Sequence, residues 1–85
     1  MKRERTILVV DDEARIVSLV ETALRQAGYA VVTASSGSTA LERLDESIDL
    51  VLTDLRMPDT DGLALLSEAR RRGFTIPVVL MTAFG

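Results

Sequence analysis

Short apolar runs along the chain alternate with longer segments in which apolar residues recur at a helical period. The runs at 6–10, 29–34, 50–53 and 78–81 consist mainly of β-branched and aliphatic residues. Continuous apolar runs of this length are typical of strands that are buried on both faces of a parallel sheet. Pro77 precedes the last run, and proline is tolerated at the first position of a strand. The pattern therefore predicts four strands.

Each gap between these runs carries the pattern of a helix. After Glu13, a helix that Gly28 ends is expected to bury one face, formed by Ile16, Val20, Ala23, Leu24 and Ala27. A second, short helix with Ser36 as its N-cap has its apolar face at Ala40, Leu41 and Leu44. A third helix, ended by Gly73, has its apolar face at Leu63, Leu66 and Ala69. The element order is therefore β-α-β-α-β-α-β.

Strands that alternate with short helices predict an α/β fold with right-handed crossovers. We expect a doubly wound parallel sheet of order 2-1-3-4, with helices on both faces. The 85 residues suffice for one domain.

Composition narrows the possible functions. The chain is 47% apolar and 27% charged, which is typical of a globular protein. Its net charge is −3 and it has no basic stripe, so we expect no nucleic-acid partner. Cysteine and histidine are absent, so any metal ion must be bound by oxygen. The first apolar run is too short for a signal peptide or a membrane span, which predicts a cytoplasmic protein with no membrane partner.

Acidic residues follow two of the predicted strands. Asp11 and Asp12 come directly after the first strand, and Asp54 after the third. In the expected strand order these two strands are neighbours, and ligands bind in the crevice at their carboxyl ends. Three carboxylates packed together repel one another unless a cation lies among them. Mg²⁺ fits such oxygen ligands best, and beside it one carboxylate can act as a nucleophile toward phosphorus.

Two small residues follow the fourth strand and end at the same edge of the sheet. The hydroxyl of Thr82 can donate a hydrogen bond to a phosphoryl oxygen, and Ala83 leaves room for a phosphodonor. Each polar residue alone has a simpler explanation, since acids before helices cap them and aspartates after strands form turns. Chance nevertheless rarely places all of them at the carboxyl ends of strands.

Three segments contain the site residues, in this order along the chain: 9–13 (VVDDE), 54–58 (DLRMP) with Gly62, and 81–83 (MTA). They resemble the motifs of response-regulator receiver domains, which are the phosphoacceptor modules of two-component systems. The resemblance covers essentially the whole chain. It implies a flavodoxin-like receiver fold and identifies residues 1–85 as a single, partial receiver domain.

The resemblance also implies a role for each site residue. Asp54 would accept a phosphoryl group from a sensor histidine kinase. Asp12 would bind Mg²⁺ directly, Asp11 would bind it directly or through water, and the main-chain carbonyl of Arg56 would be a further ligand. Thr82 would contact the phosphoryl group and move on its arrival, with Ala83 as its small neighbour. A regulated output domain would be the other partner.

The family pattern continues beyond this sequence, through a fourth helix, a fifth strand and a fifth helix. Its fifth strand ends in a lysine that pairs with the phosphoryl group, whereas the only lysine here is Lys2. We expect the apolar strand 78–81 to be a sheet edge with unpaired backbone groups, and such edges recruit another chain. A homo-oligomer formed through this edge is therefore predicted.

Phosphorelay signalling is the leading hypothesis, with the chain acting as a regulatory domain and not as an enzyme. One alternative is a truncated receiver that no longer switches and acts only as a structural or oligomerisation module. A second is a small phosphohydrolase with an aspartate nucleophile. Such enzymes usually place nucleophile and acid two residues apart, whereas Asp11 and Asp12 are adjacent.

Overall fold

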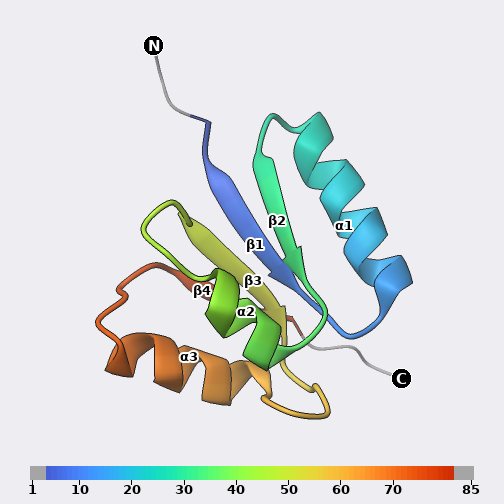
Figure 1. Ribbon diagram of the computed structural model, residues 1–85. Coiled ribbons are helices and arrows are strands. Elements are labelled where there is room, and N and C mark those ends of the chain that lie inside the picture. Colours follow the sequence, from blue (N-terminus) through green and yellow to red (C-terminus); the bar gives the residue numbers. More distant parts are fainter. Residues whose placement is uncertain (1–3, 82–85) are drawn as a thin grey trace.

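The computed structural model describes residues 4–81, which form a four-stranded parallel sheet and three helices (Figure 1). The elements, in chain order, are β1 (Thr6–Val10), α1 (Ala14–Gln26), β2 (Ala30–Ala34), α2 (Gly37–Arg43), β3 (Leu50–Asp54), α3 (Gly62–Arg71) and β4 (Val78–Met81). The strand order is β2-β1-β3-β4. The predicted fold class, element order and strand order are therefore confirmed.

The central strand β1 supplies side chains to both faces of the sheet, because successive side chains of a strand point in opposite directions. Leu8 and Val10 are fully buried in the larger core, which α2 and α3 cover with residues such as Ala40 and Leu65. Val9, also fully buried, belongs to a smaller core on the opposite face. The helices thus enclose the sheet from both sides, with α1 alone on its face (Figure 1).

The helix ends follow the chemistry of their cap residues. The Oγ of Ser36 accepts a hydrogen bond of 3.1 Å from the amide of Thr39, which confirms the predicted N-cap of α2. After α1, Gly28 has a φ of 99°, a conformation that glycine adopts without strain. The amide of Tyr29 then donates to the carbonyl of Leu24 over 3.0 Å. Tyr29 therefore belongs to the helix end, and β2 begins one residue later than its apolar run predicts.

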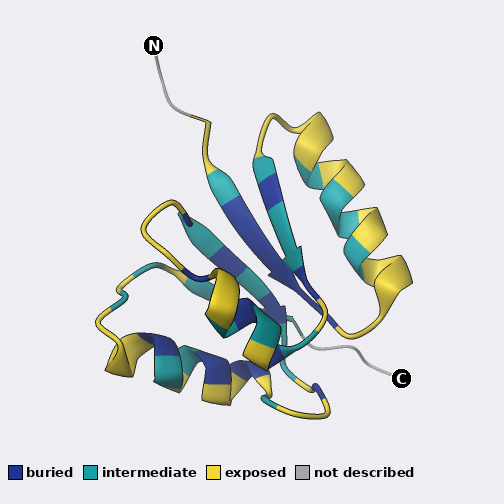
Figure 2. Cartoon of the chain, in the orientation of Figure 1, coloured by how far each residue is buried: buried dark blue, intermediate teal, exposed yellow. Residues whose placement is uncertain are grey.

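Two of the predicted helix faces need correction. In α3 the predicted Ala69 is buried, but Leu63 is 56% exposed while Leu65 is only 2% exposed, so the buried face runs through Gly62, Leu65 and Ala69. In α1 no residue is fully buried, and Ile16 is 36% exposed. Figure 2 shows α1 as largely exposed on its outer side. The smaller core receives only part of the predicted face of α1, at Val20 and Leu24.

One side of β4 pairs with β3, and within residues 4–81 no strand pairs with its other side. Val79 on this strand is 45% exposed. None of the helices in the described part of the chain is long and apolar enough to cross a membrane.

Candidate functional site

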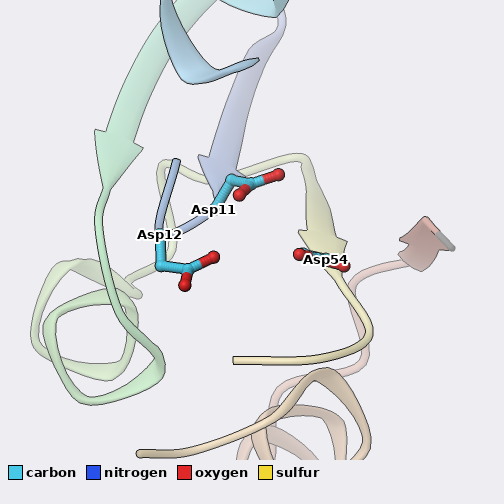
Figure 3. A group of neighbouring side chains, drawn as sticks. All are labelled: Asp11, Asp12 and Asp54. Carbon is cyan, nitrogen blue, oxygen red and sulfur yellow. The ribbon is translucent and has the colours of Figure 1, made fainter. Parts of the chain in front are cut away.

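The carboxyl ends of β1 and β3 bring the three predicted acids together. β1 and β3 are neighbours, with Val10 aligned to Thr53, so the residues that follow them meet at one edge of the sheet. Asp11, Asp12 and Asp54 each offer a carboxylate oxygen, and these oxygens all lie within 4.8 Å of one another. Figure 3 shows the three side chains arranged around a common space. The predicted clustering of these acids is therefore confirmed.

The three acids differ in how the backbone holds them. Asp11 is only 5% exposed, and its Oδ1 accepts a hydrogen bond of 2.9 Å from the amide of Glu13. Asp12 is exposed, whereas Asp54 is partly buried and accepts a hydrogen bond of 3.3 Å from the amide of Arg56. The site thus has one buried acid, one acid open to solvent and one between these extremes.

Negative charge is concentrated at this edge. Burial raises the pKa of Asp11, and the nearby carboxylates of Asp54 and Asp12 raise it further, while the amide of Glu13 acts in the opposite direction. Within residues 4–81, none of the three acids forms an ion pair with an arginine. A divalent cation would offset this repulsion, and three hard oxygen donors are the ligand type that Mg²⁺ prefers.

The loop between β3 and α3 continues directly from Asp54. Arg56, whose main-chain carbonyl was predicted to bind the metal ion, lies in this loop with its side chain exposed, and that role stays a prediction. The amide of Leu55 donates to the carbonyl of Met81 over 2.8 Å, so the end of β4 lies beside Asp54. Thr82 and Ala83 lie outside the described residues.

Two features of the structure could not be predicted from the pattern of apolar residues. A cavity of about 300 Å³ borders Asp11 and Asp12 and is also lined by Ser18 of α1 and Thr33 of β2. In addition, the side chain of Ser38 in α2 is hydrogen-bonded to Asp59 in the β3–α3 loop. The partners in both features are far apart in the sequence, so only the folded chain reveals them.

The chain is thus an α/β domain with a doubly wound parallel sheet and three carboxylates at the switch point of that sheet. Comparison with protein families gives a more specific result. The family model of the response regulator receiver domain matches residues 7–85 of the chain. The chain therefore belongs to the response regulator receiver domain family. Members of this family are regulatory domains of two-component signal transduction.

Characterised relatives agree with this assignment. The chain is 46% identical over 79 residues to the transcriptional regulatory protein ZraR of Escherichia coli strain K12, covering 92% of this chain and 18% of ZraR. It is 39% identical over 80 residues to the alkaline phosphatase synthesis transcriptional regulatory protein PhoP of Bacillus subtilis, covering 93% of this chain and 33% of PhoP. The chain thus corresponds in length to a third or less of either relative.

Solved structures share the fold. A response regulator receiver domain protein from Clostridium thermocellum matches with a TM-score of 0.88 and 34% identity, over 95% of this chain and 67% of that chain. The response regulator TrrA of Thermotoga maritima, solved in complex with Mg²⁺-BeF, matches with a TM-score of 0.85 and 36% identity, over 95% of this chain and 71% of TrrA.

Proposed function

We propose that the chain accepts a phosphoryl group on Asp54 from a sensor histidine kinase and passes the signal to an output domain. The observation that carries this proposal is the meeting of Asp11, Asp12 and Asp54 within 4.8 Å at the carboxyl ends of β1 and β3. Membership of the receiver family supports it. In the transfer, a carboxylate oxygen of Asp54 forms a bond to phosphorus while the bond from phosphorus to the donor histidine breaks.

Asp11, Asp12 and the main-chain carbonyl of Arg56 are the proposed ligands of Mg²⁺. When bound, the cation would neutralise negative charge on the phosphoryl oxygens. The raised pKa of Asp11 and the hard oxygen donors of the cluster support this choice. A complex with Mg²⁺-BeF in the structure of the relative TrrA also supports it.

Thr82 is the proposed contact of the phosphoryl group, with Ala83 as the small neighbour that admits the donor. Movement of Thr82 on phosphorylation would begin the conformational switch. The proposed role is regulatory, with turnover limited to the chain's own phosphorylation and dephosphorylation, and the proposed location is the cytoplasm. Family membership favours signalling over both a purely structural module and a phosphohydrolase.

The experiment is phosphorylation of the 85-residue chain with acetyl phosphate and Mg²⁺, followed by intact-mass analysis. We expect one phosphate-sized mass increment, which disappears in Asp54→Asn and when EDTA removes Mg²⁺. Asp45→Asn is the matched control, because Asp45 is exposed and lies in a different loop. A wild-type chain that gains no phosphate, or an increment that persists in Asp54→Asn, would refute the proposal.

A further inference from the structure

The loop that follows the proposed phosphoacceptor is hydrogen-bonded to the start of α2. The Oγ of Ser38 donates to Oδ2 of Asp59 over 2.7 Å, although 21 positions separate the two residues. The other carboxylate oxygen of Asp59 accepts from the amide of Thr60 over 2.6 Å. Both oxygens of one carboxylate are therefore engaged, and the side chain connects α2 to the β3–α3 loop.

A close backbone contact accompanies this hydrogen bond. Gly37 is buried against Thr60, and a Cβ atom added at Gly37 would lie 2.3 Å from the carbonyl oxygen of Thr60. Real Cβ atoms do not approach an oxygen so closely, so the contact requires glycine at this position. The loop is thus fixed to α2 by two neighbouring contacts of different kinds, one polar and one steric.

The two ends of the loop are hydrogen-bonded to each other just after β3. The amide of Gly62 donates to the carbonyl of Leu55 over 2.9 Å, which closes the loop on itself. Arg56 lies between this closure and Asp59, and its amide donates to Asp54. With both ends fixed, the main chain around Arg56 has little freedom to move relative to the acids.

We infer that Ser38 and Asp59 are positioning residues for the cation site. Their hydrogen bond holds the loop so that the main chain at Arg56 stays beside Asp54. The inference rests on the proposed binding of Mg²⁺ and adds two residues that neither bind the ion nor contact the phosphoryl group. Residues that orient metal ligands typically change metal affinity by 10–100-fold when they are replaced.

Because Ser38 and Asp59 are exposed, a positioning role can be distinguished from a merely structural one. Hydrogen bonds at the surface contribute little to global stability, because water replaces them when they are lost. Removing the Ser38 hydroxyl should therefore weaken Mg²⁺ binding while leaving the unfolding midpoint nearly unchanged. Linkage also requires the effect to be reciprocal, so Mg²⁺ binding should alter the environment of Ser38.

The chain contains a matched control for this contact. The Oγ of Ser47 donates to Oδ1 of Asp45 in the loop between α2 and β3. Both residues are exposed, like Ser38 and Asp59. The hydrogen bond from Ser47 lowers the pKa of Asp45, as the one from Ser38 lowers the pKa of Asp59. Ser47→Ala removes the same chemical contact away from the acid cluster.

The experiment is a Mg²⁺ titration of the 85-residue chain followed by ¹⁵N NMR, with urea unfolding measured for each variant. We expect Ser38→Ala and Asp59→Asn to raise the Kd for Mg²⁺ by about tenfold. The double variant should be no worse than the weaker-binding single variant. Ser38→Thr should retain affinity, and Ser47→Ala should match the wild type. Ser38→Ala decides the matter, because it leaves every charge in place.

The two proposals fail in different ways. A wild-type chain with no saturable Mg²⁺ response would overturn the proposed function and this inference together. Saturable binding in the wild type with an unchanged Kd in Ser38→Ala would overturn the inference alone. So would an equal loss of affinity in Ser47→Ala, or a wild-type titration in which the amide of Ser38 does not respond.

Discussion

Gly62, the first residue of α3, lies against the main-chain carbonyl of Asp54, and a Cβ atom at Gly62 would stand 2.6 Å from that oxygen. The same Cβ atom would lie 2.8 Å from Cδ2 of Leu80. The leucine side chain can rotate away, but the carbonyl cannot move without shifting Asp54 itself. The start of α3 therefore constrains the backbone at the proposed phosphoacceptor.

Gly62→Ala is accordingly expected to destabilise the chain by about 1–3 kcal/mol, the usual effect of overpacking a buried position. Phosphorylation of Asp54 should also slow, because the added methyl group displaces its carbonyl. Urea unfolding and the rate of labelling by acetyl phosphate measure the two effects. Ser67→Ala is the control, because Ser67 is exposed on the same helix. An unfolding midpoint for Gly62→Ala equal to that of the control would contradict the packing described.

Two leucines in α3 provide a test of which face is buried. Leu65 is 2% exposed and Leu63 is 56% exposed. Leu65→Ala should reduce the free energy of unfolding by about 2–5 kcal/mol, since it leaves a cavity in the larger core. Leu63→Ala should change it by less than about 0.5 kcal/mol, as is usual for exposed positions. Chemical denaturation of both variants checks this, and equal losses would show that the buried face is assigned incorrectly.

The buried face of α3 is harder to predict from the sequence than the four strands are. Residues 63–66 (LALL) allow more than one apolar face, and periodicity alone favours Leu63 and Leu66. The structure buries the predicted Ala69 but combines it with Leu65 and Gly62, which lies against the carbonyl of Asp54. The strands were easier to predict, since buried parallel strands are apolar at every position whichever way each side chain points.

The acid cluster was also predictable, for a topological reason. Strand order and parallel direction suffice to bring the residues after β1 and β3 to one edge, without any knowledge of side-chain packing. The contact between Ser38 and Asp59 depends on loop conformation and the close approach of Gly37 to Thr60. No periodicity or local motif encodes such a pairing.

Asp11 should destabilise the metal-free fold at neutral pH, because burial and the neighbouring anions raise its pKa. A carboxyl whose folded pKa is raised contributes stability below its ordinary value of 3.8, and loses it as the pH rises through the raised value. Asp11→Asn should therefore raise the thermal midpoint at pH 7 without Mg²⁺, and have little effect near pH 3. Added Mg²⁺ should stabilise the wild type but not the variant. A lower midpoint for the variant at pH 7 without Mg²⁺ would contradict this account.

The contribution of Glu68 in α3 to stability should have the opposite dependence on pH. Hydrogen bonds from Arg71 and then Arg72 lower its pKa from 4.5 to about 2. A lowered carboxyl pKa contributes stability above pH 4.5 and loses it as the pH falls toward 2. Glu68→Gln should therefore flatten the loss of stability between these two pH values. The effect should be small, because the group is at the surface. Urea midpoints measured at several pH values test it, and parallel curves for wild type and variant would exclude the interaction.

The free side of β4 leads to a prediction about association of the 85-residue chain. Within residues 4–81 this strand pairs only with β3, and its residues include Val79, which is 45% exposed, and the partly buried Leu80. An apolar strand with unpaired amide and carbonyl groups is a template for another strand. We therefore expect concentration-dependent dimers or larger species in sedimentation velocity at micromolar protein. Val79→Lys should shift the population toward monomer, because a lysine on an edge strand disfavours pairing. Leu19→Lys is the matched control, since Leu19 is an exposed apolar residue on α1. This helix packs on β1 and β2, and β2 is the edge strand opposite to β4. A wild-type chain that stays monomeric at these concentrations, or association that Leu19→Lys reduces as much as Val79→Lys does, would show that the β4 edge does not recruit a second chain.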